Sequence, residues 1–211
     1  MGEFFNPEKG IWAWMSTLTD VVGLSVLWIF LCLPVVTAGP ATAALYYTVV
    51  KCVRGRESGA FGEYLRSFRT NFRVGLGATL IVLPLFLMLL AGYKIVLWYG
   101  TRLGGVAYVL YVAYYFALVL PAGVLCWLFP LLGRFEYRVR DLFRTAFQLT
   151  IAHLPSTVVI VLLTGQSAVF CLNRWWPVVF LPVVAMLLVS LFTERIFARY
   201  VPELAAKEET E

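Results

Sequence analysis

The sequence has little charge and few of the residues that usually carry out chemistry. Charged residues make up 14% of the chain, and His153 is the single histidine. Nucleotide-binding glycine loops, nucleophile elbows and spaced metal-ligand motifs are missing. No acidic or basic residue lies near the centre of a long apolar run, where proton relays and ion pumps place one. We therefore do not expect an enzyme, and we assign no catalytic, cofactor-binding or metal-binding residue.

Paired cysteine spacings are missing as well. Cys32, Cys52, Cys126 and Cys171 lie far apart, and three of them fall in apolar runs. Such cysteines are typical of packing residues rather than of a disulfide framework or a zinc site. His153 has no nearby Asp or Glu in sequence, so we interpret it as an interfacial or packing residue rather than a general base.

Apolar residues, in contrast, are abundant. The chain is 61% hydrophobic and 16% aromatic, with a mean hydropathy of +0.83. A soluble fold of 211 residues could not bury that much apolar surface, so lipid must be the solvent. The net charge of +5 then indicates basic loops at a membrane rather than a nucleic-acid partner.

Five long apolar runs are candidate transmembrane helices. A helix needs about 20 apolar residues to cross about 30 Å of hydrocarbon, and these runs lack the alternation of barrel strands. The runs are Val21 to about Thr37, Val74–Leu97, Gly105–Leu132, Leu149–Leu172 and Trp175–Thr193. The expected fold is an all-α polytopic membrane helix bundle with five transmembrane helices.

The distribution of basic residues predicts the orientation of these helices. Thirteen Lys and Arg residues fall in the loops after the first and third runs and in the C-terminal tail, against four on the other side. By the positive-inside rule the N-terminus is outside and the C-terminus is in the cytoplasm. We expect an outer interfacial segment at residues 1–20, a transmembrane domain at 21–193 and a cytoplasmic tail at 194–211.

The first apolar run is too long for one straight helix. Residues 21–50 carry no charge, and as one helix they would extend about 45 Å. Gly39 can end a helix and Pro40 suits the first turn of the next. We expect the first helix to end near Thr37 and a second to run from Pro40 to about Val53. The residues of this break are Pro34, Thr37, Gly39 and Pro40. The break is either a packing joint or the lining of a cavity.

A short motif occurs in both basic loops. The sequence "FRTNF" covers Phe68–Phe72 and "FRTAF" covers Phe143–Phe147. Each copy precedes a run that would cross from inside to outside, so the chain could be a parallel repeat of two hairpins plus a fifth helix. The alternative is that membrane chemistry alone produces the match. Around the first copy the apolar residues recur at helical spacing, which is typical of a helix on the inner leaflet or of a docking surface.

A specific pattern surrounds the break and continues into the first basic loop. It comprises Trp28, Leu33-Pro34, Thr37, Gly39-Pro40, Ala43-Ala44-Leu45, Phe68, Asn71 and Phe72. Over about Asp20–Gly75 the sequence resembles the YesL-like family of bacterial integral membrane proteins, a domain of unknown function. The resemblance implies a small multi-pass protein of the bacterial cytoplasmic membrane, often encoded beside carbohydrate ABC importers. It implies no established reaction and no catalytic residue.

Two functions follow as hypotheses. The favoured one, which rests mainly on the resemblance, is a non-enzymatic accessory protein associated with a carbohydrate ABC importer. Its expected partners are membrane lipids and ABC permease or ATPase subunits, and a homo-oligomer is compatible with this role. The expected partner-binding residues are Phe61, Leu65, Phe68, Arg69, Asn71, Phe72, Phe143 and Arg144. The alternative is a small-solute carrier or channel, acting alone or as a dimer. Its polar cavity would be lined by Thr164, Gln166 and Ser167 in the fourth run and by Thr37 and Thr42 at the break.

Overall fold

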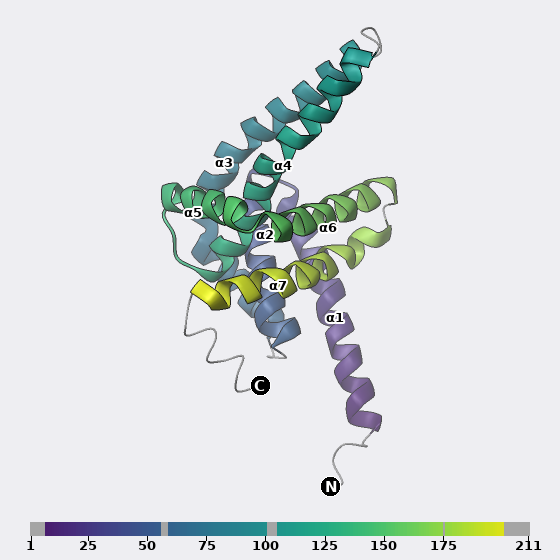
Figure 1. Cartoon of the computed structure of the whole chain (residues 1–211). Helices are drawn as coiled ribbons and strands as arrows, with labels where there is room; N and C mark the ends of the chain where they lie inside the picture. The colour runs from purple at the N-terminus through teal and green to yellow at the C-terminus, as the bar shows by residue number, and fades with distance from the viewer. Residues whose placement is uncertain (1–6, 56–58, 101–104, 175, 201–211) are drawn as a thin grey trace.

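The protein is an all-α bundle. The computed structural model describes residues 7–55, 59–100, 105–174 and 176–200, and these residues form helices and turns with no strand among them (Figure 1). The α-helices are α1 (Pro7–Cys32), α2 (Ala38–Thr48), α3 (Ala60–Gly100), α4 (Gly105–Arg134), α5 (Val139–Ala152), α6 (Leu154–Asn173) and α7 (Leu181–Tyr200). Two 3₁₀ turns, Val35–Thr37 and Trp176–Val179, and a π-helical turn, Val49–Arg54, join some of them. The predicted helical fold class is confirmed.

Several helices have the length and composition of membrane spans. Within the described residues, Ala60–Met88, Leu154–Cys171 and Leu181–Arg199 are each long and apolar enough to cross a membrane. Shorter apolar helical segments, Leu18–Cys32 and Leu120–Arg134, lie in α1 and α4. The five predicted runs thus overlap α1, α3, α4, α6 and α7, and three of these helices could span the bilayer.

The helices pack as two hairpins around a short central helix. Helices α3 and α4 run side by side as a long hairpin that extends beyond the rest of the bundle (Figure 1). Helices α6 and α7 form a second hairpin that crosses this body. Helix α2 contacts α1, α3, α4 and α7. It therefore lies at the centre of the molecule.

The buried side chains form two clusters, and α2 contributes to both. Ala43 and Tyr46 belong to a cluster with residues of α4, α5, α6 and α7. Ala44 and Leu45 belong to a second cluster with residues of α1, α3 and α7. All four side chains are fully buried. Because opposite faces of one short helix carry both clusters, α2 holds the two halves of the core together.

Small residues let α2 approach its neighbours closely. A Cβ atom added to Gly75 of α3 would lie 2.9 Å from the Cα of Pro40, and one added to Gly133 of α4 would lie 2.6 Å from the carbonyl oxygen of Ala43. A Cβ on Gly39 would likewise lie 2.8 Å from the carbonyl oxygen of Gly75. Backbones that approach so closely leave no room for side chains, as at the small-residue crossings of membrane helices.

The break in the first apolar run is present, but it lies several residues earlier than predicted. Helix α1 ends at Cys32 and α2 begins at Ala38, so Gly39 and Pro40 lie in the first turn of α2. The cause is Pro34, whose ring disfavours helical geometry at the preceding residue and which is itself extended, with φ −76° and ψ 108°. The expectation that Pro40 sits in a first helical turn is confirmed.

The Thr37 side chain closes the turn between the two helices. Its hydroxyl lies 2.5 Å from the carbonyl oxygen of Leu31 and 2.7 Å from that of Pro34. The backbone N–H of Thr37 also donates to the Pro34 carbonyl, at 2.8 Å. These bonds satisfy carbonyl groups that the end of α1 leaves without helical partners.

Two other boundaries differ from the predictions. The basic amphipathic segment around Phe61–Arg73 is continuous with the apolar run after it in α3, because no residue there stops the helix. The predicted fourth run instead spans a break at His153, where φ is −124° and ψ is 48°. Pro155, in the first turn of α6, accounts for this break, because it has no N–H to donate to the Ile151 carbonyl and its ring would clash with that carbonyl in a continuous helix. The motif copies thus lie in different settings, one inside α3 and one in the separate helix α5.

The segments predicted at the two ends of the chain lie partly outside the described residues. Residues 7–20 of the predicted interfacial segment belong to α1, in one helix with the first apolar run. Residues 194–200 of the predicted tail form the last part of α7. Residues 1–6 and 201–211 are outside the described ranges.

Candidate functional site

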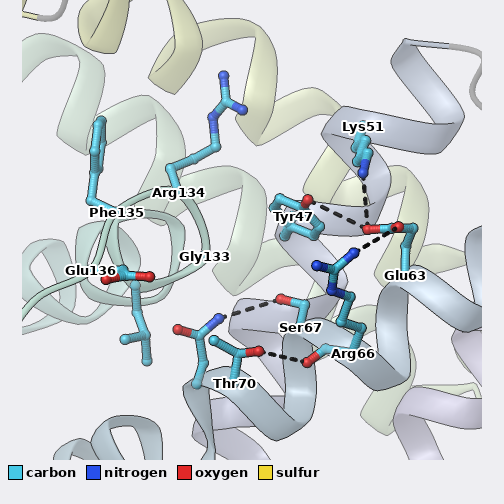
Figure 2. A pocket seen from close by; sticks show the side chains of 12 residues that line it. Tyr47, Lys51, Glu63, Arg66, Ser67, Thr70, Gly133, Arg134, Phe135 and Glu136 are labelled. Atoms are coloured by element: carbon cyan, nitrogen blue, oxygen red, sulfur yellow. Dashed lines mark hydrogen bonds and ion pairs between the residues drawn. The ribbon is translucent and has the colours of Figure 1, made fainter.

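A polar pocket lies where the end of α2, the π-helical turn, the first turns of α3 and the end of α4 come together (Figure 2). Its volume is about 460 Å³. It is lined by Tyr47, Lys51, Glu63, Arg66, Ser67, Thr70, Asn71, Leu132, Gly133, Arg134, Phe135 and Glu136. Its size is that of a small-molecule site, and most of its side chains are charged or can form hydrogen bonds.

One side of the pocket is organised around the Glu63 carboxylate. Lys51 Nζ lies 3.0 Å from Glu63 Oε2, and the Tyr47 hydroxyl donates to the same oxygen at 3.4 Å. Lys51 Nζ also lies 5.6 Å from the centre of the Tyr47 ring. The hydrogen bond to Glu63 raises the pKa of the Lys51 ammonium above its usual range. Lys51 is therefore held as a fixed cation at this side of the pocket.

The first turns of α3 supply a row of polar side chains beside this group. Arg66, Ser67, Thr70 and Asn71 follow the spacing of one helical face. Asn71 Nδ2 donates to Ser67 Oγ at 3.3 Å, and the Thr70 hydroxyl donates to the Arg66 carbonyl at 3.0 Å. The Arg66 side chain is 79% exposed, with Nη1 4.0 Å from Glu63 Oε1. Its guanidinium is thus available to a ligand at the pocket mouth.

The end of α4 forms the other side of the pocket. Helix α4 ends at Arg134, and the following residues, Phe135 and Glu136, turn away from the helix axis. The Phe135 ring packs edge to face against Phe197 of α7, with 5.4 Å between ring centres. Glu136 is exposed, and Figure 2 shows it across the hollow from Lys51, Glu63 and Arg66.

A buried charge network lies behind the pocket and joins α2, α4 and α7. Arg134 Nη2 lies 2.7 Å from Glu194 Oε2. The Tyr46 hydroxyl donates to Glu194 Oε1 at 2.7 Å and lies 2.7 Å from Thr193 Oγ1. Tyr46 and Thr193 are fully buried, and Glu194 is 6% exposed. This network fixes the end of α4, and with it one wall of the pocket. Arg134 Nε is a buried donor without a partner in the described part of the chain.

The structure places the predicted partner-binding residues in several environments. On α3, Phe61 and Leu65 are exposed, whereas Phe68 packs against the core cluster around α1 and α2. Phe68 and Phe72 make an edge-to-face contact, with 5.5 Å between ring centres. Asn71 lines the polar pocket. These residues therefore do not form one exposed surface.

The remaining predicted residues are divided in the same way. Arg69 on α3 and Arg144 on α5 are exposed, while Phe143 packs against the core cluster of α4 to α7. On α5 one exposed stripe consists of Arg140, Arg144, Phe147 and Ile151, and Asp141, Gln148 and Ala152 are exposed beside it. We call the first four residues the α5 stripe.

The residues expected to line a carrier cavity bond mainly within their own helix. The Thr164 hydroxyl donates to the Ile160 carbonyl at 2.8 Å, and the Ser167 hydroxyl donates to the Leu163 carbonyl at 2.7 Å. Gln166 is exposed. The polar pocket is lined neither by these residues nor by the residues of the helix break.

Sequence reasoning missed most of the pocket and the whole buried network. Lys51 and Arg134 were visible as charges at the ends of apolar runs, and Glu63 as a charge in the first basic loop, but nothing in a single sequence shows that such charges converge. Glu194 offered the clearest signal. It follows the last apolar run directly, and a carboxylate in that position needs a cation when a neighbouring helix covers it.

Residues 21–93 match the family model of a protein of unknown function, DUF624. The matched region runs from the last part of α1 through the helix break and α2 into α3. It contains the pocket residues of α2, the π-helical turn and α3, whereas Arg134, Glu136 and Glu194 lie outside it. No curated protein and no solved structure matches the chain.

Proposed function

We propose that this chain is a non-enzymatic integral protein of the bacterial cytoplasmic membrane that associates with a carbohydrate ABC importer. In this proposal all five apolar helices cross the bilayer, with the N-terminus outside and the basic loops in the cytoplasm. The match to DUF624 overlaps the segment that resembles the YesL-like family, and that resemblance is the reason for naming an importer.

The observation that carries this proposal is the α5 stripe. Phe147 and Ile151 are 51% and 49% exposed, and they lie on the same helical face as the exposed Arg140 and Arg144. The opposite face of α5 is packed, because Leu142, Ala146 and Leu149 are buried. An exposed aromatic anchor beside arginines has the composition of a protein–protein contact. We therefore place the contact with a permease or ATPase subunit on α5.

Serine in place of Phe147 and Ile151 is expected to weaken binding of the importer about thirtyfold, because truncating an aromatic anchor costs about 2 kcal/mol of binding. The measurement is purification from the membrane in mild detergent, with permease and ATPase subunits quantified by mass spectrometry. Leu162→Ser is the matched control, because Leu162 is 65% exposed on the apolar helix α6. Recovery of the wild-type chain without importer subunits would contradict the proposal. If the α5 variant recovered as much importer as the wild type, the α5 stripe would not be the importer contact, and its partner would be lipid headgroups.

The polar pocket favours a second candidate function, a small-solute carrier or channel acting alone or as a dimer. Its mixture of hydroxyl, amide and charged groups suits a hydroxylated solute. Proteoliposomes that hold only this protein would then take up labelled glucose or maltose faster than empty liposomes. Asn71→Leu would abolish the difference, whereas Gln166→Leu, outside the pocket, would not. Uptake equal to that of empty liposomes would rule out this candidate for these two sugars.

A further inference from the structure

The polar pocket carries charges of opposite sign on its two sides. Lys51 and Arg66 face it together with Glu63, which leaves a net positive charge on that side. Glu136 provides a negative charge on the other side (Figure 2). The Arg134 charge is compensated by Glu194 behind the wall. The pocket is thus close to neutral as a whole but strongly polarised across its width.

Each side has a group able to bind a ligand of opposite charge. Lys51 is engaged by Glu63 at 3.0 Å, whereas the contact of Arg66 with Glu63 is 4.0 Å long and the Arg66 side chain is 79% exposed. A guanidinium has five N–H donors in a plane, a geometry that suits the oxygens of phosphate and carboxylate groups. The exposed carboxylate of Glu136 can accept hydrogen bonds from an ammonium group.

The position of the pocket along the helices gives further information. Asn71, its last residue on α3, comes three residues before Val74, where the long apolar run begins. On α4 the pocket is lined by Leu132, Gly133 and Arg134, the last residues of that helix. On both helices the pocket therefore lies where the apolar segment ends, which is the depth of lipid headgroups around a membrane-spanning helix.

We propose that the polar pocket binds a zwitterion that carries a phosphate at one end and a primary ammonium group at the other. Arg66 holds the phosphate, with the Asn71 amide and the Thr70 hydroxyl beside it. Glu136 accepts hydrogen bonds from the ammonium group across the hollow. This chemistry occurs in the headgroup of phosphatidylethanolamine and in free phosphoethanolamine compounds. The inference concerns the pocket alone and does not depend on the proposed association with an importer.

The test measures binding of three soluble headgroups to the purified full chain in detergent. The probes are glycerophosphoethanolamine, glycerophosphocholine, which lacks N–H donors, and glycerol 3-phosphate, which lacks the cation. Glycerophosphoethanolamine is expected to bind about tenfold more tightly than the other two, because only it can form the charged hydrogen bonds to Glu136. The same chain in nanodiscs is expected to retain phosphatidylethanolamine over phosphatidylcholine and phosphatidylglycerol in native mass spectrometry.

Variants separate the two charged contacts. Arg66→Gln is expected to weaken binding of glycerophosphoethanolamine about tenfold. Glu136→Gln is expected to remove the preference for glycerophosphoethanolamine over glycerol 3-phosphate. Arg69→Gln and Asp141→Asn are the matched controls, because both residues are exposed and neither lines the pocket. Both controls should bind like the wild type.

Each result supports or overturns the assignment. A preference seen with the lipid and not with the soluble headgroup identifies a phospholipid as the source, and a preference seen with both identifies the headgroup chemistry alone. Equal binding of all three headgroups together with no lipid preference, or a Glu136→Gln variant that keeps the ethanolamine preference, would overturn it. Importer recovery uses a different surface, so either proposal can fail without the other.

Discussion

Replacing Glu194 by alanine is expected to destabilise the protein by about 2–4 kcal/mol. Glu194 is 6% exposed, its carboxylate lies 2.7 Å from Arg134 Nη2, and the carboxylate accepts a hydrogen bond from the Tyr46 hydroxyl. Its removal leaves a mostly buried guanidinium without a counter-charge, which typically costs 3–5 kcal/mol. We expect a cost near or below the lower end of this range because the Arg134 side chain keeps 22% of its surface exposed. The measurement is reversible unfolding in mild detergent by titration with sodium dodecyl sulfate.

Two further variants separate the charge effect from a loss of packing. Glu136→Ala removes a carboxylate that is exposed, and its stability should stay within about 0.5 kcal/mol of the wild type. The double variant Arg134→Met, Glu194→Leu removes both charges and should recover most of the lost stability, since a buried pair can often be replaced by apolar residues of similar volume. A Glu194→Ala variant as stable as Glu136→Ala would show that the network contributes nothing to folding.

Replacing Gly75 by leucine is expected to destabilise the protein by about 3 kcal/mol, because there is no space for a side chain where α3 crosses α2. The first added carbon alone would lie 2.9 Å from Pro40 Cα, and overpacking a tight site by a few carbons typically costs 1–3 kcal/mol or more. The same unfolding titration measures the change. We expect α2 to shift away from α3 and the yield of folded protein to fall.

Gly62 offers a matched control on the same helix. A Cβ at Gly62 meets no atom within 4 Å, and replacing an exposed helical glycine by leucine should stabilise the helix by about 0.5–1 kcal/mol. The two substitutions are chemically identical, so the difference between their effects on stability reports the close contact where α3 crosses α2. If Gly75→Leu were as stable as Gly62→Leu, the close approach of α2 and α3 would not hold in solution.

The comparison of sequence and structure shows which features a single sequence determines. The run Gly105–Leu132 predicted α4 to within two residues, because apolar length and flanking charges mark the ends of such a helix. Pro34 and Pro155 explain two of the three boundaries that were placed wrongly, and both signals were present in the sequence. For the first boundary, Gly39-Pro40 gave a competing signal a few residues later. In the structure Pro34 lies in the break before α2, and Pro40 lies in the first turn of α2.

The pocket was harder to predict for a physical reason. Polar residues at the end of an apolar run have the same pattern whether they point into water or toward one another. Glu63 and Lys51 are twelve residues apart, while Glu136 lies far along the chain from both. Their convergence depends on how α3 and α4 pack against α2, and this depends on the close contacts at Gly75 and Gly133. The positions of the charged residues in the sequence therefore do not determine the site.

The central position of α2 also has a consequence for the synthesis of this protein. With eleven residues, α2 is about 16 Å long and too short to cross a bilayer on its own. One of the helices that cover it is α7, which is synthesised after the other helices that contact α2, and Val183 and Val189 of α7 belong to the two clusters that α2 joins. The core around α2 can therefore close only after α7 has been translated.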